Sequence, residues 1–83
     1  MLIKVLGSGC SKCRKLEENV HKALMENTVS ADVEKVTDLQ TIMSYGVMLT
    51  PALVIDEKLI SAGKLLSVKD IASILEKEVD NAR

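Results

Sequence analysis

The first apolar run of the chain spans residues 2–6 and predicts a short strand. In that strand Ile3 and Val5 lie on one face, and Leu2 and Leu6 lie on the other. Apolar residues on both faces are typical of a central strand that is covered on both sides. We therefore expect this strand in the interior of a sheet.

A helical pattern follows once residues 7–9 (Gly-Ser-Gly) have broken the strand, and we expect it to end near Asn27. Residues 31–36 then alternate between apolar and charged positions, which predicts an edge strand. Thr37 or Asp38 can cap a short helix that Gly46 closes. The apolar stripe of the first helix has the spacing i, i+4, i+7 and i+8: Leu16, Val20, Ala23 and Leu24.

The second half of the chain predicts a hairpin and a last helix. The strand at 52–55 is apolar throughout, residues 56–57 (Asp-Glu) suit a two-residue turn, and residues 58–62 return as its partner. Ser67 is expected to cap the last helix. The apolar stripe of that helix is Val68, Ile71, Ala72, Ile74, Leu75 and Val79.

The resulting order, β-α-β-α-β-β-α, predicts one α/β domain over residues 1–83. The first β-α-β unit should be parallel and right-handed, and the third and fourth strands should be antiparallel. The expected architecture is a mixed four-stranded sheet with helices on both faces.

Composition excludes several classes of function. The chain has 83 residues, 47 % of them apolar, and a net charge of −1 from 11 basic and 12 acidic side chains. The high apolar fraction and the low net charge argue against disorder. The lack of excess basic charge argues against nucleic-acid binding, which needs basic residues to hold phosphates and usually aromatic rings on which bases stack. No apolar run approaches the ~20 residues of a membrane span, and the N-terminal run is too short for a signal peptide. We expect a cytoplasmic monomer.

Cys10 and Cys13 carry the chemistry, because their Cys-x-x-Cys spacing falls where the first strand gives way to the first helix. Unpaired N–H groups and the positive end of the helix dipole favour a thiolate at Cys10. Cys13 lies one turn further on and can reach back to resolve a mixed disulfide. Lys12 adds a cation that would stabilise the thiolate. A basic helix face that is simply exposed to solvent explains a lysine at this position equally well.

The same two cysteines could instead bind metal, either as half of a zinc site or as a Cu(I) carrier. A structural zinc site needs four ligands, and His21, the remaining strong candidate, falls outside the apolar stripe as a solvated residue would. A redox pair without metal or added cofactor is therefore favoured, and a small copper-carrier-like module is the alternative. A partner-binding scaffold without catalysis is a third possibility.

Thr50 and Pro51 introduce the buried strand at 52–55. Proline is tolerated at the first position of a strand because it lacks an N–H group. A cis Thr50–Pro51 bond would turn the Thr50 backbone outward to pair with a substrate strand, whereas base rates for X-Pro bonds favour trans.

Together, the Cys10–Cys13 motif, the stretch 45–55 through Thr50-Pro51 and the passage from Gly63 into the last helix resemble the thioredoxin superfamily. The chain is most similar to its small, glutaredoxin-sized members of archaea and bacteria. The resemblance implies a thiol–disulfide oxidoreductase in which Cys10 is the nucleophile, Cys13 resolves and Pro51 is cis. It also implies a protein disulfide as substrate and a reductant like thioredoxin reductase.

The sequence departs from that family at several positions. Gly9 stands where thioredoxins have tryptophan, so the surface beside Cys10 offers less apolar area and a narrow set of partners is expected. Lys4 occupies the position of their buried acid, and we expect its ammonium group to extend into solvent. Gly63 and Asp70 are only weakly similar to the glutathione-binding residues of glutaredoxins.

Overall fold

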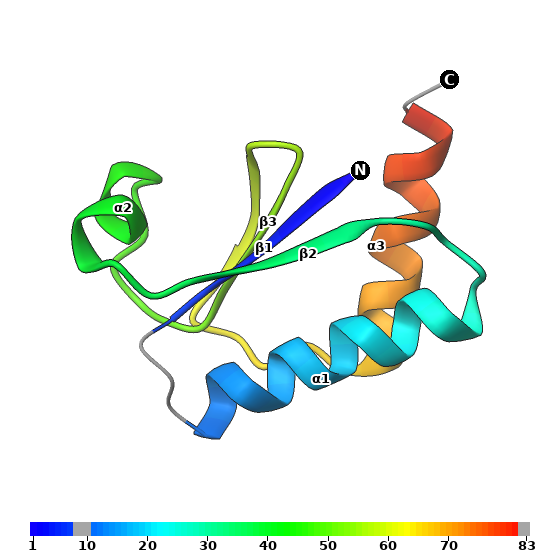
Figure 1. Ribbon diagram of the computed structural model, residues 1–83, viewed down its shortest axis with the longest axis horizontal. Helices are drawn as coiled ribbons and strands as arrows, with labels where there is room; N and C mark the ends of the chain where they lie inside the picture. The colour runs from blue at the N-terminus through cyan, green and yellow to red at the C-terminus, as the bar shows by residue number, and fades with distance from the viewer. Residues whose placement is uncertain (8–10, 82–83) are drawn as a thin grey trace.

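The computed structural model describes residues 1–7 and 11–81, and its elements follow in the predicted order (Figure 1). Within these residues, no helix is long and apolar enough to cross a bilayer. The elements are β1 (Leu2–Leu6), α1 (Ser11–Glu26), β2 (Asp32–Val36), α2 (Leu39–Ser44), β3 (Ala52–Ile55), β4 (Lys58–Ala62) and α3 (Val68–Asn81).

The strands form a four-stranded sheet in the order β2-β1-β3-β4. β1 pairs in parallel with β2 and antiparallel with β3, and β3 pairs antiparallel with β4. This confirms the mixed sheet, the central position of β1 and the edge position of β2. Because the two inner strands carry apolar side chains on both faces, the sheet needs a cover on each side.

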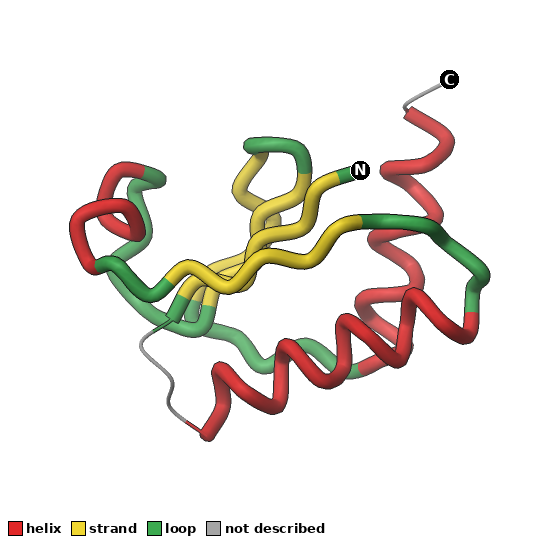
Figure 2. The backbone as a smooth tube through the Cα atoms, viewed as in Figure 1, coloured by secondary structure: helices red, strands yellow, loops and turns green. Residues whose placement is uncertain are grey.

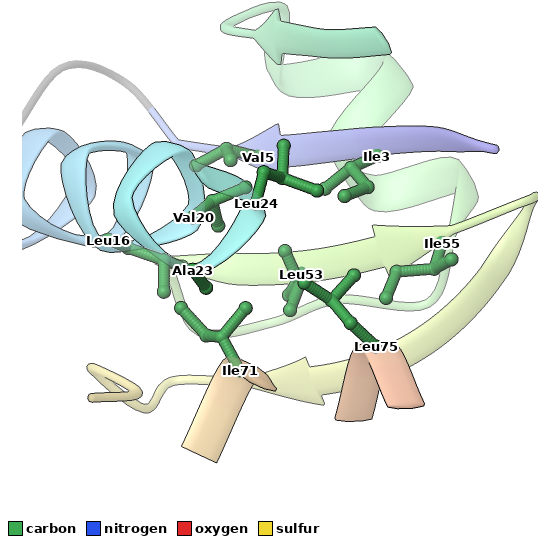
Figure 3. Close-up of a cluster of buried hydrophobic side chains, with 10 residues drawn as sticks. All are labelled: Ile3, Val5, Leu16, Val20, Ala23, Leu24, Leu53, Ile55, Ile71 and Leu75. Atoms are coloured by element: carbon green, nitrogen blue, oxygen red, sulfur yellow. The ribbon is translucent and has the colours of Figure 1, made fainter. Parts of the chain in front are cut away.

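One face of the sheet is covered by α1 and α3, and it holds the larger core. Figure 3 shows side chains of β1 and β3 directed toward those of the two helices. The predicted stripe of α1 is buried there in full, as are two positions of the α3 stripe. The buried members of this cluster are Ile3, Val5, Leu16, Val20, Ala23, Leu24, Leu53, Ile55, Ile71 and Leu75.

The opposite face is covered by the short helix α2 and the segment that follows it, so helices flank the sheet on both sides (Figure 2). Alternation along β1 explains the division, because Leu6 points to this face while Ile3 and Val5 point to the other. The buried members of this second cluster are Leu6, Val36, Ile42, Val47, Ala52 and Val54.

Local signals in the sequence set the ends of these elements. The Asp38 carboxylate accepts a hydrogen bond from the Thr41 N–H group at 3.1 Å and caps α2. Ser67 caps α3 in the same way, and Asp70 reaches back to the Ser67 N–H group. The β3–β4 turn has φ of 48° at Asp56 and 66° at Glu57, values that suit a tight hairpin.

Asn19 is a buried polar residue of α1 whose side-chain hydrogen bond the periodicity of the helix did not predict. Its side chain is 7 % exposed, and its amide nitrogen donates to the carbonyl oxygen of Leu66 at 2.9 Å. The bond joins α1 to the segment that leads into α3. It therefore helps to fix the two helices that cover the larger core.

Candidate active site

Cys13 lies in the first turn of α1, where its side chain is 2 % exposed and faces the end of β1. The residue it meets there is Gly7, itself buried. A methyl group placed on the Gly7 Cα would lie 2.3 Å from the Cys13 Sγ and 3.0 Å from its Cβ. The sulfur thus occupies the space that a side chain at position 7 would take.

Cys10, the predicted nucleophile, lies outside the described residues, as do Ser8 and Gly9. By sequence it directly precedes Ser11, the first residue of α1.

Thr50 reaches the same place from the loop before β3. Its Cβ is 4.0 Å from the position that a Gly7 methyl group would occupy, so Thr50 and the Cys13 sulfur border the same small space. Thr50 is exposed, whereas Pro51 is buried, and the peptide bond between them is cis. The fold therefore brings Cys13 together with a residue that is 37 positions away along the chain.

The Thr50–Pro51 segment is fixed from behind by the end of β4. The Gly63 N–H group donates to the Pro51 carbonyl oxygen at 2.8 Å. Gly63 has a φ of +76°, and a methyl group on it would lie 2.9 Å from the Cβ of Leu49. Glycine is required here both by the backbone conformation and by the lack of space.

Lys12, the cation predicted beside the cysteines, lies on the exposed side of α1 with two further basic residues. Lys12, Arg14 and Lys15 are all exposed, and the first turn of the helix contains no acidic residue. The Lys15 ammonium group is 3.7 Å from a carboxylate oxygen of Glu18. Lys12 is thus placed at the positive end of the helix, where its charge adds to the dipole.

His21, which the sequence presents as a solvated helix residue, is exposed on α1. Among the described residues, no three His, Cys, Asp or Glu side chains gather in a way that could hold a metal ion. Asp70, the faint counterpart of a glutathione-binding acid, has its carboxylate 3.4 Å from the Ser67 N–H group at the start of α3.

An apolar groove borders Thr50 on the side of α2. Met48 is 95 % exposed, and Leu39 and Met43 are also largely exposed. Sequence reasoning missed this surface, because it considered only the residues beside Cys10 in the chain. The groove has a volume of about 470 Å³ and is lined by Thr37, Leu39, Ile42, Met43, Val47, Met48 and Thr50.

Lys4 does not simply extend into solvent, as the sequence suggested, but ends on two specific partners. Its ammonium group donates to the Tyr45 hydroxyl at 2.8 Å and to the Glu57 carboxylate at 2.6 Å. The hydrogen bond to Glu57, followed by that to Tyr45, raises the pKa of Lys4. The hydrogen bonds that Glu57 accepts from Lys4 and from the Tyr45 hydroxyl lower the pKa of Glu57. Neither partner could be identified from a local sequence signal, because they lie 41 and 53 positions away.

Comparison with known proteins identifies the family. A family model described as a thioredoxin domain matches residues 1–76. A thioredoxin of Methanocaldococcus jannaschii is 35 % identical over 80 residues, which cover 96 % of this chain and 92 % of that protein. A thioredoxin of Methanothermobacter thermautotrophicus is 33 % identical over 75 residues, which cover 90 % of this chain and 97 % of that protein.

A solved structure described as that of a malarial protein has the same fold. It matches with a TM-score of 0.68 over 92 % of this chain and 93 % of its own, at 13 % sequence identity. At that identity the likeness establishes the fold alone, and it confirms the thioredoxin-like architecture expected from the sequence. Given the family model and the two archaeal relatives, this chain belongs to the thioredoxin family of thiol–disulfide oxidoreductases.

Proposed function

We propose that the protein reduces disulfides of other proteins through Cys10 and Cys13. The Cys10 thiolate attacks one sulfur of the substrate disulfide, forms a mixed disulfide and releases the other substrate sulfur as a thiolate. Cys13 then gives up its thiol proton and attacks the Cys10 sulfur, closing the Cys10–Cys13 bond and releasing the second substrate thiolate, which can take up that proton. The cysteine pair loses two electrons, the substrate gains them, and each released thiolate can take up a proton.

The observation that carries this proposal is the position of Cys13. In a chain of this family, the sulfur expected to resolve the mixed disulfide is buried in the first turn of α1 and borders the same space as Thr50. A buried second sulfur suits a resolving role, because a substrate cannot easily reach it while a neighbouring cysteine can. No added cofactor is required, since the cysteine pair itself carries the electrons.

Lys12 and the start of α1 favour the thiolate form of Cys10 in this proposal. Backbone N–H groups at a helix start and a nearby ammonium group both stabilise a negative charge. Because α1 has no acid in its first turn, nothing in that turn counteracts this effect. The thiolate of Cys10 is therefore the attacking species near neutral pH.

Thr50, Pro51 and the apolar groove beside them receive the substrate. Thr50 is exposed next to the Cys13 sulfur, and the groove continues from it toward Met48. An extended substrate segment could pair with the Thr50 backbone while one apolar side chain enters the groove. The substrate is thus a protein disulfide flanked by apolar residues, and a reductant like thioredoxin reductase restores the dithiol. We expect a narrow set of protein partners and a monomer acting in the cytoplasm.

The proposal is tested with insulin as a disulfide substrate and dithiothreitol as electron donor. The native protein should accelerate insulin reduction, and Cys13→Ser should accumulate a mixed disulfide through Cys10. Cys10→Ser is the matched control, which keeps one cysteine but should form no mixed disulfide. Reduction by Cys13→Ser at the native rate would contradict the resolving role, and an inactive native protein would contradict the function as a whole.

A further inference from the structure

Gly7 must be glycine for a different reason from Gly46 and Gly63. Gly46 and Gly63 have positive φ values, 79° and 76°, whereas Gly7 does not. A side chain at position 7 is excluded by space alone, since its Cβ would lie 2.3 Å from the Cys13 Sγ. Real Cβ contacts need more than about 3.5 Å, so the sulfur would have to move by roughly 1 Å or more.

The strand side of this contact is held by backbone pairing, whereas the cysteine side is a packed side chain that can shift only at a cost. The Gly7 N–H group donates to the Val36 carbonyl oxygen at 2.9 Å, which extends the pairing of β1 with β2 and holds the Gly7 backbone. Cys13 is in a helix, where one of the three χ1 rotamers is largely excluded, and its side chain is packed at 2 % exposure. An added methyl group would therefore displace the sulfur rather than the strand.

We propose that Gly7 is a positioning residue for Cys13, which sets the place of the resolving sulfur by leaving it room at the end of β1. This inference rests on the proposed function, because the step concerned is the attack of Cys13 on the Cys10 sulfur. In that step the Cys10–Cys13 bond forms, the bond from Cys10 to the substrate sulfur breaks, and the substrate thiolate leaves with the electron pair. A shift of about 1 Å in the attacking atom can slow such a step up to a hundredfold.

The test compares Gly7→Ala with Gly46→Ala, which also adds one methyl group to a glycine but meets nothing within 4 Å. Each reduced protein is mixed with insulin, quenched in acid at successive times and analysed by mass spectrometry for the mixed disulfide. We expect the mixed disulfide of Gly7→Ala to persist roughly ten to a hundred times longer than the native one. That of Gly46→Ala should decay within about twofold of the native rate, because its methyl group meets nothing within 4 Å and so leaves the Cys13 sulfur in place, even though the positive φ of Gly46 lowers the stability of this variant.

A second readout is the equilibrium between dithiol and disulfide, measured in dithiothreitol redox buffers. Disulfide bonds tolerate little change in geometry, whereas two separate thiols can adjust. Gly7→Ala should therefore disfavour the disulfide and make the couple more oxidising, by about 30 mV for each tenfold change in the equilibrium constant. A Gly7→Ala protein that matches Gly46→Ala in both lifetime and potential would overturn the inference.

A double-mutant cycle with Cys13→Ala tests the contact itself, independently of any activity. Under reducing conditions, Gly7→Ala should lower the urea midpoint much less in the Cys13→Ala background, where the obstructing sulfur is gone. If Gly7→Ala alone fails to fold, recovery of folding in the double variant supports the contact. Equal losses in both backgrounds would contradict it. If the native protein does not accelerate insulin reduction, the proposed function fails, while this cycle still reports on the contact.

Discussion

Lys4 and Glu57 are joined across the sheet, with the Lys4 ammonium nitrogen 2.6 Å from a Glu57 carboxylate oxygen. Tyr45 closes a triangle, because its hydroxyl accepts from Lys4 at 2.8 Å and donates to Glu57 at 2.9 Å. The three side chains come from β1, the end of α2 and the β3–β4 turn. They tie together the elements around the smaller core and explain how a lysine that is 16 % exposed is accommodated in a central strand.

The stability that this triangle provides should depend on pH through Glu57. Its pKa is lowered in the fold by the hydrogen bonds from Lys4 and Tyr45, so its contribution is present above the ordinary glutamate value of about 4.3. The contribution is lost as the pH falls through the lower, folded value. Glu57→Gln should therefore be less stable than the native protein at pH 7, and the difference should shrink at pH 3.

Urea unfolding at the two pH values measures this difference. Glu34→Gln is the matched control, since it removes an exposed carboxylate from the edge strand β2. It should change stability little at either pH. A Glu57→Gln deficit that is the same at pH 3 as at pH 7 would show that the charge on Glu57 is not what stabilises the fold.

Gly63→Ala should destabilise the protein more than Gly46→Ala does. Both glycines have a positive φ, so an alanine at either position carries a similar backbone strain of about 1–3 kcal/mol. Only at Gly63 would the new methyl group also press on Leu49, at 2.9 Å, next to Thr50–Pro51. Chemical denaturation of the two variants measures the difference, and equal destabilisation would mean that the Leu49 side chain moves aside without cost.

Asn19→Ala should cost about 1–3 kcal/mol of unfolding free energy, because it removes a part-buried hydrogen bond and leaves the Leu66 carbonyl group without its donor. His21→Ala, an exposed change in the same helix, should stay within about 0.5 kcal/mol of the native value. Urea titration of both variants measures their unfolding free energies against the native value. A neutral Asn19→Ala would indicate that water replaces the amide at this position.

Lys12→Gln should raise the pKa of the Cys10 thiol and slow its reaction at pH 7 by about twofold, the effect of one charge near a helix end. The pH dependence of iodoacetamide alkylation in a Cys13→Ser background measures the thiolate directly. Lys69→Gln, an exposed lysine on α3, serves as the control and should leave alkylation unchanged. If both variants react alike, the basic residues of α1 are only a solvated face.

Periodicity and turn chemistry were sufficient to predict the elements and the sheet. The stripe of α1, the cap Ser67 and the turn at Asp56 and Glu57 lie where the sequence placed them, and of the two candidate caps for α2, Thr37 and Asp38, the structure uses Asp38. These features depend on residues within a few positions of one another, so their physical causes are local. The Cys-x-x-Cys motif was visible for the same reason.

The sequence by itself determined the order of the elements, the two apolar faces of β1 and the pair of cysteines available for chemistry. Only the tertiary structure decided that the Cys13 sulfur fills the space left by Gly7, that Thr50 borders that space, and that Lys4 ends on Tyr45 and Glu57. The physical reason is distance along the chain. Thr50, Tyr45 and Glu57 reach their partners only when the sheet brings β1 against β3 and α2 folds over its face, and no local pattern of residues encodes such contacts.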